Sequence, residues 1–390
     1  MKQKLLFVLP SLRSGGAEKS LATLLRLLDY SRYDVDLLLF RREGLFLPQV
    51  PPQVRVLDAG EEYAVFDGAA RPALAYFLRR GMFLTALRRI LYGRAIRKSA
   101  ADSLPTMWRQ LRRMLPKLSG YETAVAYLEG TSTYYVLDCV QAKKKVAFLH
   151  TDYDRIAFQK DMDAPYYARL DRLVGVSAQC TEKAEVYFPC LVGKTATVQN
   201  LIAPSVLHDM AKAERPLPQD GTPNLLTVGR MSEPKGIDMA VCACGELMRR
   251  GYDFRWYHIG VGEQQREIEA LIEQQQVRQR FILLGERGNP YPYYQQCDIY
   301  VQPSRFEGKS IAVDEAKCFA RPIVVTDFGT VRDQIEDGVD GLIAPISPQG
   351  IADAVQRLLC SPQLRQTLSD NLQEEKTGNE EEIEKLYALL

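Results

Sequence analysis

One continuous segment of the chain reads Asp298-Ile299-Tyr300-Val301-Gln302-Pro303-Ser304-Arg305-Phe306-Glu307-Gly308-Lys309-Ser310-Ile311-Ala312-Val313-Asp314-Glu315-Ala316. The apolar run that ends at Gln302 predicts a short buried strand, closed by the proline that follows it, and the run from Ile311 to Phe319 predicts a helix. In open α/β sheets, ligands bind in the loops at the carboxyl ends of strands. The segment therefore predicts an α/β protein with a ligand site between this strand and this helix.

Two glutamates frame the predicted ligand site. Glu307 lies in the loop, and Glu315 lies one turn inside the helix. We expect free backbone N–H groups at Gly308 to Ile311 to point out of the helix N-terminus, where they can bind an anion. Carboxylates accept hydrogen bonds from hydroxyl groups. Two carboxylates beside an anion site predict a ligand that carries phosphates and several hydroxyls, and a nucleotide sugar is such a ligand.

The composition is that of an ordinary soluble globular protein, with 46% hydrophobic and 25% charged residues in a chain of 390. The length allows two to three domains. The net charge of +1 predicts no polyanionic partner, and hence no nucleic acid. Because no run of 18 apolar residues occurs, we predict no transmembrane span. The eight cysteines lack metal-ligand spacing, which predicts reduced thiols in a cytoplasmic protein.

Short apolar runs alternate with helical patterns along the whole chain, which is typical of parallel α/β sheets. The predicted strands of the first half are Leu5–Leu9, Val35–Phe40, Thr123–Tyr127, Lys145–Leu149, Arg172–Val176 and Thr195–Val198. Those of the second half are Leu225–Val228, Arg255–Ile259, Arg280–Leu283, Ile299–Gln302, Ile323–Val325 and Gly341–Ile343. Helices fit between them, for example at Ala17–Leu28, Ile237–Arg250, Gln264–Gln275 and Gly350–Leu359.

Residues 200–224 are polar and rich in proline, without a clean periodicity, so we interpret them as a linker. The predicted domains are therefore residues 1–203 and 204–372, two α/β halves that face each other across a cleft. Residues 373–390 form a third segment. Its acidic run and its apolar end, from Leu386 to Leu390, predict a surface helix whose last turn docks apolar side chains.

Residues 71–117 differ from the rest of the chain. They carry 12 lysines and arginines against a single acidic residue, Asp102. The basic residues alternate with apolar ones such as Phe83, Leu87 and Trp108. This pattern predicts basic amphipathic helices, which can lie on an anionic membrane surface. The alternative is a set of basic surface helices that simply pack on the first domain.

Three further motifs follow predicted strands. Gly15 and Gly16 lie between the first strand and the first helix and can approach a phosphate closely, although a purely structural turn is an equal alternative. Arg230 and Lys235 follow another strand and suit a diphosphate, with two solvated surface charges as the alternative. His150, after an apolar strand, is a candidate catalytic or ligand-orienting group, or else a structural histidine.

Two apparent motifs are rejected. A pair of aspartates separated by one residue, which can indicate a metal-bound nucleotide sugar, occurs at Asp34/Asp36, Asp152/Asp154 and Asp161/Asp163. About 1.5 such matches arise by chance in a chain with this many aspartates, so we assign no metal and expect no cofactor. The run Gly308-Lys309-Ser310 resembles the end of a phosphate-binding P-loop, but Pro303 replaces the glycine that this loop requires.

Taken together, these residues resemble glycosyltransferase family 4, a family of retaining enzymes with the GT-B fold. The matching elements, in order, are Gly15-Gly16-Ala17-Glu18, His150, Gly229-Arg230 with Lys235-Gly236, Asn289-Pro290 with Tyr291-Pro292, and Glu307 with Glu315. The resemblance covers nearly the whole chain and is strongest over residues 224–343. It implies an α/β protein of two facing Rossmann-like domains with an interdomain cleft. The donor would bind in the C-terminal domain and the acceptor mostly in the N-terminal one, on which the tail helix would pack.

The resemblance also implies roles for single residues. Arg230 and Lys235 would hold the donor diphosphate, and Glu315 the ribose hydroxyls. Glu307 and the backbone of Gly308, Lys309, Ser310 and Ile311 would hold the transferred sugar and the phosphates. Gly15 and Gly16 would close over the diphosphate, His150 would lie near the sugar, and the loop Gly285 to Tyr291 would hold the base. Members of the family often have an aromatic or aliphatic residue and then Gly or Pro after Glu-Gly. Lys309-Ser310 departs from this pattern, so Lys309 is a candidate for contact with a charged group on donor or acceptor.

The implied function is that of a retaining hexosyltransferase that uses a nucleotide diphosphate sugar, with UDP expected from the habit of the family. Its catalytic residues would be Glu307, His150, Arg230 and Lys235. The implied acceptor is a saccharide, linked to a lipid, in the synthesis of cell-envelope or capsular polysaccharide. We expect a cytoplasmic location with peripheral contact at the inner face of the cell membrane. The alternatives are a nucleotide-sugar epimerase or phosphorylase of the same fold, and a non-catalytic partner of another transferase.

Overall fold

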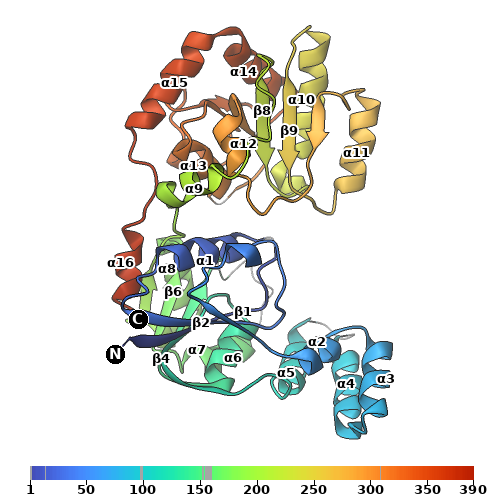
Figure 1. Ribbon diagram of the computed structural model, residues 1–390, viewed down its shortest axis with the longest axis vertical. Coiled ribbons are helices and arrows are strands. Elements are labelled where there is room, and N and C mark those ends of the chain that lie inside the picture. Colours follow the sequence, from blue (N-terminus) through green and yellow to red (C-terminus); the bar gives the residue numbers. More distant parts are fainter. Residues whose placement is uncertain (1, 14, 97–99, 152, 154–159, 308) are drawn as a thin grey trace. The chain divides into compact units, whose positions relative to one another are not determined.

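The computed structural model describes residues 2–13, 15–96, 100–151, 153, 160–307 and 309–390, and it excludes the side chains of 100–103. The chain divides into two compact units (Figure 1). Unit 1 contains Met1–Leu201 and Asn379–Leu390, and unit 2 contains Ile202–Gly378. The predicted domain boundaries lie after residues 203 and 372. The observed boundaries lie after Leu201 and Gly378.

Unit 1 is built on one parallel sheet with the strand order β3-β2-β1-β4-β5-β6-β7. Its strands are β1 (Gln3–Leu9), β2 (Tyr33–Leu39), β3 (Arg55–Asp58), β4 (Leu118–Ala126), β5 (Val140–Leu149), β6 (Arg172–Gly175) and β7 (Thr195–Thr197). Alternate residues of β1 enter two different apolar clusters, with Leu6 and Val8 in one and Leu5 and Phe7 in the other. Both faces of the sheet are therefore buried, which explains why its strands are nearly continuous apolar runs.

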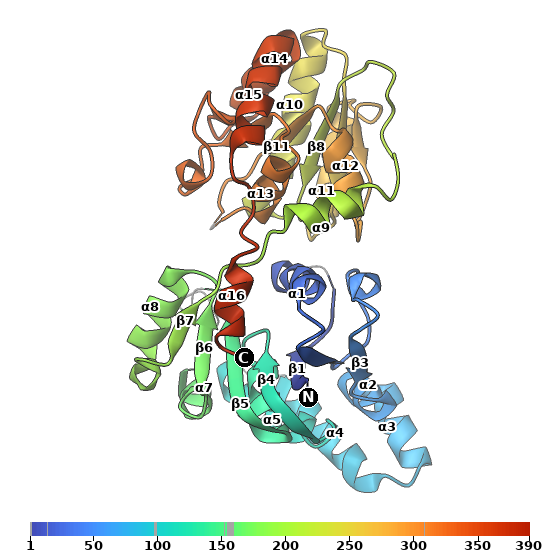
Figure 2. The ribbon, with the colours of Figure 1, turned by 60° about the vertical axis from the view of Figure 1, so that its left-hand side comes forward.

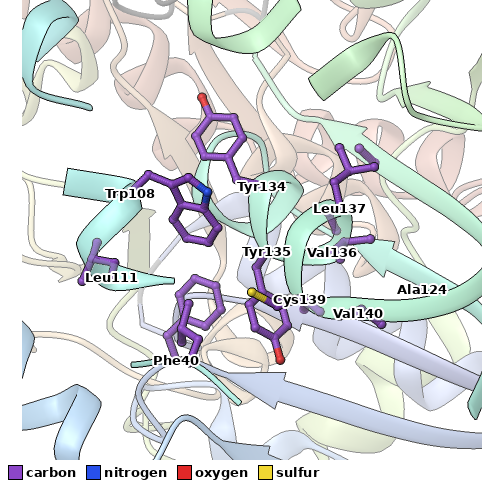
Figure 3. Packing of buried hydrophobic residues seen from close by; sticks show 14 of the residues in the cluster. Phe40, Trp108, Leu111, Ala124, Tyr134, Tyr135, Val136, Leu137, Cys139 and Val140 are labelled. Carbon is purple, nitrogen blue, oxygen red and sulfur yellow. The ribbon is translucent and has the colours of Figure 1, made fainter. Parts of the chain in front are cut away.

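The helices of unit 1 include a group formed by the basic segment. They are α1 (Gly16–Leu27), α2 (Glu61–Asp67), α3 (Ala70–Arg79), α4 (Phe83–Ile96), α5 (Ala100–Leu111), α6 (Thr131–Cys139), α7 (Lys160–Tyr167), α8 (Ala178–Tyr187) and α16 (Glu382–Tyr387). Trp108 of α5 packs against Tyr134 of α6 with 5.7 Å between ring centroids, and Phe40 and Tyr135 pack beside them (Figure 3). Among the described residues of 71–117, α3, α4 and α5 are helical, and this aromatic cluster attaches α5 to the sheet.

Unit 2 repeats the architecture with the strand order β10-β9-β8-β11-β12-β13, again all parallel. Its strands are β8 (Asn224–Val228), β9 (Arg255–Ile259), β10 (Phe281–Leu283), β11 (Ile299–Gln302), β12 (Ile323–Thr326) and β13 (Leu342–Ala344). Its helices are α9 (Pro204–Ala211), α10 (Ile237–Arg249), α11 (Gln265–Gln274), α12 (Tyr291–Gln296), α13 (Ile311–Cys318), α14 (Pro348–Cys360) and α15 (Pro362–Glu374). The predicted α/β class with two Rossmann-like domains is confirmed.

The order of the strands predicts a ligand site in each unit. In unit 2 the chain runs outward from β8 in one direction through β9 and β10, and from β11 in the other through β12 and β13. The order therefore reverses between β8 and β11, and it reverses in the same way between β1 and β4 of unit 1. Open α/β sheets bind ligands at such reversals, outside the carboxyl ends of the strands.

The strand β3 and the helix α9 are among the elements that were not predicted from the sequence. The strand β3 has four residues, of which Arg55 and Asp58 are exposed, so it shows no apolar run. The helix α9 lies inside the segment predicted as an irregular linker, and that prediction is wrong for Pro204–Ala211. Proline is tolerated in the first turn of a helix, and Leu207 and Ala211, four residues apart, are buried in the core of unit 2.

The tail helix α16 packs on unit 1, as Figure 2 shows. Leu386 and Leu390 are buried among the apolar residues of the sheet. The ring of Tyr387 stacks on Tyr33 at 5.5 Å, and the hydroxyl of Thr123 donates a hydrogen bond of 2.7 Å to the terminal oxygen of Leu390. Among the described residues, no helix is long and apolar enough to cross a membrane.

The docking of the tail predicts a stability effect confined to unit 1. Leu386→Ala should lower the free energy of unfolding of this unit by about 2–5 kcal/mol, because it deletes a fully buried side chain. The chain has one tryptophan in each unit, Trp108 and Trp256, so fluorescence of Trp108 in a Trp256→Phe background reports on unit 1 alone. Val186→Ala, at an exposed position of α8, is the control. Equal urea midpoints for both variants would contradict docking of the tail.

Candidate functional site

The candidate site of unit 2 lies where β8 and β11 end side by side. The loop after β8 leads to Gly236, and the loop after β11 begins at Pro303. Gly236 adopts φ +64°, and a Cβ atom there would lie 2.0 Å from the carbonyl oxygen of Pro303. Only glycine fits both the backbone conformation and this contact. The two loops can therefore approach each other closely at the reversal of the sheet.

A salt bridge joins the two loops. The ammonium group of Lys235 donates to both carboxylate oxygens of Glu307, at 2.7 Å to Oε1 and 2.9 Å to Oε2. Glu307 is buried, and its Oε1 also accepts from Ser304 at 2.7 Å and from Gln302 at 3.1 Å. The structure thus brings together two of the predicted catalytic residues, and it holds the carboxylate of Glu307 in one orientation.

A second ion pair that the sequence did not reveal lies beside the first. Arg305 makes a bidentate contact with Asp238 of α10, with distances of 2.7 and 2.5 Å. Burial opposes ionisation of Asp238, but its hydrogen bonds with Arg305 outweigh that effect, so the pKa of this carboxyl lies below its ordinary value. Backbone bonds from Arg305 and Phe306 to the carbonyl of Pro234 complete the contact. Arg305 and Asp238 are therefore positioning residues for the loops that carry Lys235 and Glu307.

Arg230 lies at the exposed end of the same arrangement. Its side chain is exposed, whereas the preceding residue, Gly229, lies next to the aliphatic part of Lys235: a Cβ atom added at Gly229 would lie 3.7 Å from Cδ of Lys235. The carbonyl of Gly229 accepts a hydrogen bond of 3.0 Å from the ring of His258, which must be donated by Nε2–H because a carbonyl can only accept. His258 thereby fixes the backbone from which Arg230 projects.

The N-terminus of α13 differs from the prediction of free N–H groups. The N–H of Ser310 donates to the side chain of Gln334 at 2.8 Å, and Gln334 donates back to the carbonyl of Ser310 at 3.0 Å. The prediction of a free N–H is therefore wrong at Ser310, since an amide 24 residues away satisfies it. Ile311 begins the helix, and its N–H is among those that no carbonyl of the helix itself can satisfy. Gly308 lies outside the described residues.

The remaining residues of this group lie on or next to α13. Lys309 is exposed and pairs with Asp314 at 3.3 Å, so its charge is directed at its own helix. Glu315 is buried, and its Oε1 accepts a hydrogen bond of 3.1 Å from the hydroxyl of Tyr291. Tyr291 ends the loop that is predicted to hold the base, and Asn289 of that loop bonds to the carbonyl of Met210 at 2.7 Å. The predicted base loop and Glu315 are thus in direct contact.

Gly15 and Gly16 lie in unit 1, at the start of α1. A Cβ atom on Gly15 would fall 2.0 Å from Oε2 of Glu18. The carboxylate of Glu18 therefore lies over the backbone at the N-terminus of α1, where it interacts favourably with the positive end of the helix dipole. In this conformation a carboxylate of the protein occupies the place where the sequence predicted a phosphate.

His150 follows β5 in the same unit, next to the end of β4. Its backbone N–H donates a hydrogen bond of 3.1 Å to Oε2 of Glu129, and the centroid of its ring lies 5.1 Å from that of Tyr127. Burial lowers the pKa of His150 to about 4, so the imidazole is neutral at neutral pH. Burial also raises the pKa of the Glu129 carboxyl. A neutral imidazole can exchange a hydrogen bond with a hydroxyl group, which is compatible with the predicted orienting role.

The described part of the chain contains no group of three histidine, cysteine, aspartate or glutamate residues arranged to hold a metal ion. Two of the rejected aspartate pairs have structural partners instead. Asp36 binds Arg55 and Tyr121, and Asp163 accepts from Tyr134 and Tyr153. The pair Asp152/Asp154 lies outside the described residues.

Comparison with known proteins identifies the domain that carries the site. Residues 222–361 match the family described as Glycosyl transferases group 1. Alpha-D-kanosaminyltransferase of Streptomyces kanamyceticus is 34% identical over 155 residues, which are 39% of this chain and 40% of that protein. This chain therefore spans about two fifths of the length of that relative.

Two longer similarities cover most of the chain. N-acetylgalactosamine-N,N'-diacetylbacillosaminyl-diphospho-undecaprenol 4-alpha-N-acetylgalactosaminyltransferase of Campylobacter jejuni is 24% identical over 88% of this chain and 86% of its own length. The crystal structure of Anabaena HepE in complex with UDP-glucose superposes with a TM-score of 0.66 at 16% identity, and 99% of each chain is covered. The second similarity confirms the GT-B type of fold.

The buried histidine at the site predicts a pH dependence of stability. Burial lowers the pKa of His258 from its ordinary value of 6.5 to about 4, and its Nδ1 has no hydrogen-bond partner among the described residues. Because the pKa of His258 is lower in the folded than in the unfolded state, the stability that comes from keeping this imidazole neutral is fully present above pH 6.5. That stability is lost as the pH falls toward 4. The difference in pKa between the folded and unfolded states corresponds to about 3 kcal/mol in the free energy of unfolding.

The measurement is urea unfolding of unit 2 at several pH values, followed by Trp256 fluorescence in a Trp108→Phe background. His258→Gln keeps a donor for Gly229 and removes the titrating group, so its stability should fall less steeply than that of the parent between pH 6.5 and 4. Parallel curves for variant and parent would contradict the assignment to His258.

Proposed function

Since residues 222–361 form a domain of the family Glycosyl transferases group 1, we propose that the protein is a glycosyltransferase that takes a hexosyl unit from a nucleotide diphosphate sugar. The observation that carries this proposal is the salt bridge between Lys235 and Glu307, at the reversal of the sheet and beside the exposed Arg230. The pair combines a cation for phosphates with a carboxylate for sugar hydroxyls, which is the combination that such a donor requires.

Lys235 has the donors to serve both parts of the ligand. An ammonium group carries three N–H bonds, and two of them are directed at the oxygens of Glu307. The third is available for a phosphate oxygen, while the guanidinium of Arg230 can bind a phosphate in a bidentate manner. As the sugar leaves, negative charge develops on the diphosphate, and these two cations stabilise it. The N–H of Ile311 at the start of α13 adds a further donor.

We propose transfer with retention of configuration by front-face departure of the diphosphate. In the alternative double displacement, a carboxylate would have to attack the sugar. Oε1 of Glu307 already accepts from Lys235, Ser304 and Gln302, and Oε2 accepts from Lys235. A carboxylate with this many donors is a poor nucleophile, so its proposed role is to bind the hydroxyls of the sugar. His150 is proposed to orient a hydroxyl group as a neutral imidazole.

UDP is the proposed nucleotide, since HepE, a similar structure, was solved with UDP-glucose. Glu315 is proposed to bind the ribose hydroxyls, and the loop from Gly285 to Tyr291, which contacts Glu315 through Tyr291, is proposed to hold the base. The name of the relative from Campylobacter includes a diphospho-undecaprenol acceptor, which supports a saccharide linked to a lipid as the acceptor here. We place the reaction in the synthesis of a cell-envelope polysaccharide.

The proposal predicts large losses of activity at the two cations. Arg230→Ala and Lys235→Ala should each lower kcat by about 10²-fold or more, because each removes a group that stabilises the charge of the leaving diphosphate. Release of free nucleotide is followed with a panel of UDP-sugars, with and without acceptor. Lys212→Ala, at an exposed lysine directly after α9 in the same unit, should retain full activity. Near-normal turnover of the two site variants would remove the proposed diphosphate role.

The comparison with and without acceptor also separates the alternative functions. A transferase releases nucleotide mainly when acceptor is present, an epimerase converts the sugar without releasing nucleotide, and a non-catalytic protein does neither. A thermal-shift panel of nucleotide sugars measures donor binding independently of turnover, because a ligand that binds the folded state raises its apparent stability.

We further propose that transfer needs no metal ion, because Arg230 and Lys235 supply the positive charge at the diphosphate. Turnover should then be unchanged, within about twofold, after treatment with EDTA and removal of the chelator, as expected when no Lewis acid takes part in the reaction. A loss that Mg²⁺ or Mn²⁺ restores would contradict metal independence and leave the transferase proposal standing.

A further inference from the structure

The helix α4 of unit 1 has its apolar face on the outside. Its exposed side chains are the large apolar ones, with Phe83 at 69%, Leu84 at 60% and Leu87 at 52% of full exposure, and with Ile90 and Leu91 behind them. We refer to these five residues as the α4 face. They recur at the spacing of one side of a helix. The side of α4 that packs on the protein holds small and polar residues instead, namely Thr85, Ala86, Arg89, Tyr92 and Ala95.

Specific contacts fix this orientation of α4. Arg89 donates a hydrogen bond of 2.7 Å to the carbonyl of Gly68, and the hydroxyl of Tyr92 donates one of 2.8 Å to Asp67. The ring of Tyr92 also packs on that of Phe66 at 5.4 Å. A rotation that buried the α4 face would break both hydrogen bonds. The helix is therefore held with its large apolar side chains exposed, in contrast to the usual amphipathic helix on a soluble protein.

Within residues 71–96, which contain α4 and most of α3, the charged side chains all have one sign. Residues 71–96 contain six arginines and no acidic residue. Arg79 and Arg80, both exposed, lie just before α4, and Arg94, also exposed, follows Leu87 by seven residues and Ile90 by four, on the same side of the helix. Leu78, at the end of α3, is exposed as well. In Figure 1, α3 and α4 lie next to each other away from the sheet of unit 1.

We propose that the α4 face binds the surface of an anionic lipid bilayer. Phe83, Leu84 and Leu87 would enter the boundary between headgroups and acyl chains, and the arginines would pair with lipid phosphates while their aliphatic parts stay along the apolar layer. The inference deepens the proposed function. It rests on that function only for its biological purpose, which is to bring the protein to a lipid-linked acceptor. The binding itself follows from the face and its charges.

The same charges disfavour other occupants. In a dimer with twofold symmetry, the α4 face would meet the same face of the second copy. Arg79, Arg80 and Arg94 would then approach the same arginines of that copy. Residues 71–96 contain no carboxylate that could compensate these charges. A bilayer that contains anionic lipid supplies both an apolar layer and negative charge. Such a bilayer therefore matches both the exposed apolar side chains and the positive charge of the α4 face.

The test is co-sedimentation of the full chain with vesicles of phosphatidylcholine alone or with about 30% phosphatidylglycerol, a content typical of strongly anionic test membranes. The triple variant Phe83→Ser, Leu84→Ser, Leu87→Ser should weaken binding to anionic vesicles at least tenfold. The triple variant Arg79→Gln, Arg80→Gln, Arg94→Gln should weaken it about fivefold for each arginine, and the loss should shrink at high salt. Val186→Ser with Val192→Ser, at exposed positions of the same unit, should bind like the parent.

Each outcome decides the proposal. Equal binding to neutral and anionic vesicles, parental binding by either triple variant, or a dimer that the serine variant dissociates would overturn it. If the triple variants fail to fold by circular dichroism, the single changes Leu87→Gln and Arg94→Gln take their place. Nucleotide release with a soluble acceptor separates the two proposals, because failure of membrane binding leaves that activity intact, and failure of glycosyl transfer leaves vesicle binding intact.

Discussion

The salt bridge between Lys235 and Glu307 is the interaction on which the site of unit 2 depends. At the reversal between β8 and β11, the connections lead away from each other, β8 toward α10 and β11 toward α13. The chain therefore needs cross-links to keep the two loops together. Lys235 with Glu307 and Arg305 with Asp238 supply them. Removal of one partner from such a partly buried pair leaves a charge without compensation, so these groups support local structure as well as ligand chemistry.

The polar groups of this site have two kinds of role, and depth distinguishes them. His258 and Gln302 are buried, and they bond to Gly229 and to Glu307 respectively. Arg230 is exposed and Lys235 is partly so. The buried groups orient the backbone of Gly229 and the carboxylate of Glu307. The more exposed cations, Arg230 and Lys235, are accessible to a ligand. Because a buried histidine stays neutral, His258 can donate its hydrogen bond without adding a positive charge beneath the site.

The sequence predicted the strands far better than the contacts between loops. All twelve predicted strands form, and most of them are parallel strands that are buried on both faces and therefore consist of short apolar runs. The edge strand β3 has no such run. The contact between Ser310 and Gln334 spans 24 residues, and that between Arg305 and Asp238 spans 67. A single sequence does not reveal which side chains form such pairs, since many other carboxylates and amides are equally available to each donor.

The direction of α4 could not be predicted for a related reason. The sequence of residues 71–117 predicts basic amphipathic helices, and it left open whether their apolar side lies on an anionic membrane or packs on the first domain. The direction is set by Arg89 and Tyr92, which find partners in Gly68 and Asp67. Those partners lie 21 and 25 residues earlier in the chain, and nothing in the sequence marks them.

This orientation resolves an apparent conflict between two inferences from charge. The whole chain carries 50 basic and 49 acidic side chains, a balance that disfavours a polyanionic partner. Residues 71–96 nevertheless carry six arginines and no acidic residue, and Arg79, Arg80 and Arg94 are exposed beside the α4 face. Since charges in solution are screened beyond about 8–10 Å, a partner at this face responds to the local arginines and not to the total. A chain of nearly zero net charge can therefore present a surface that is suited to anionic lipid.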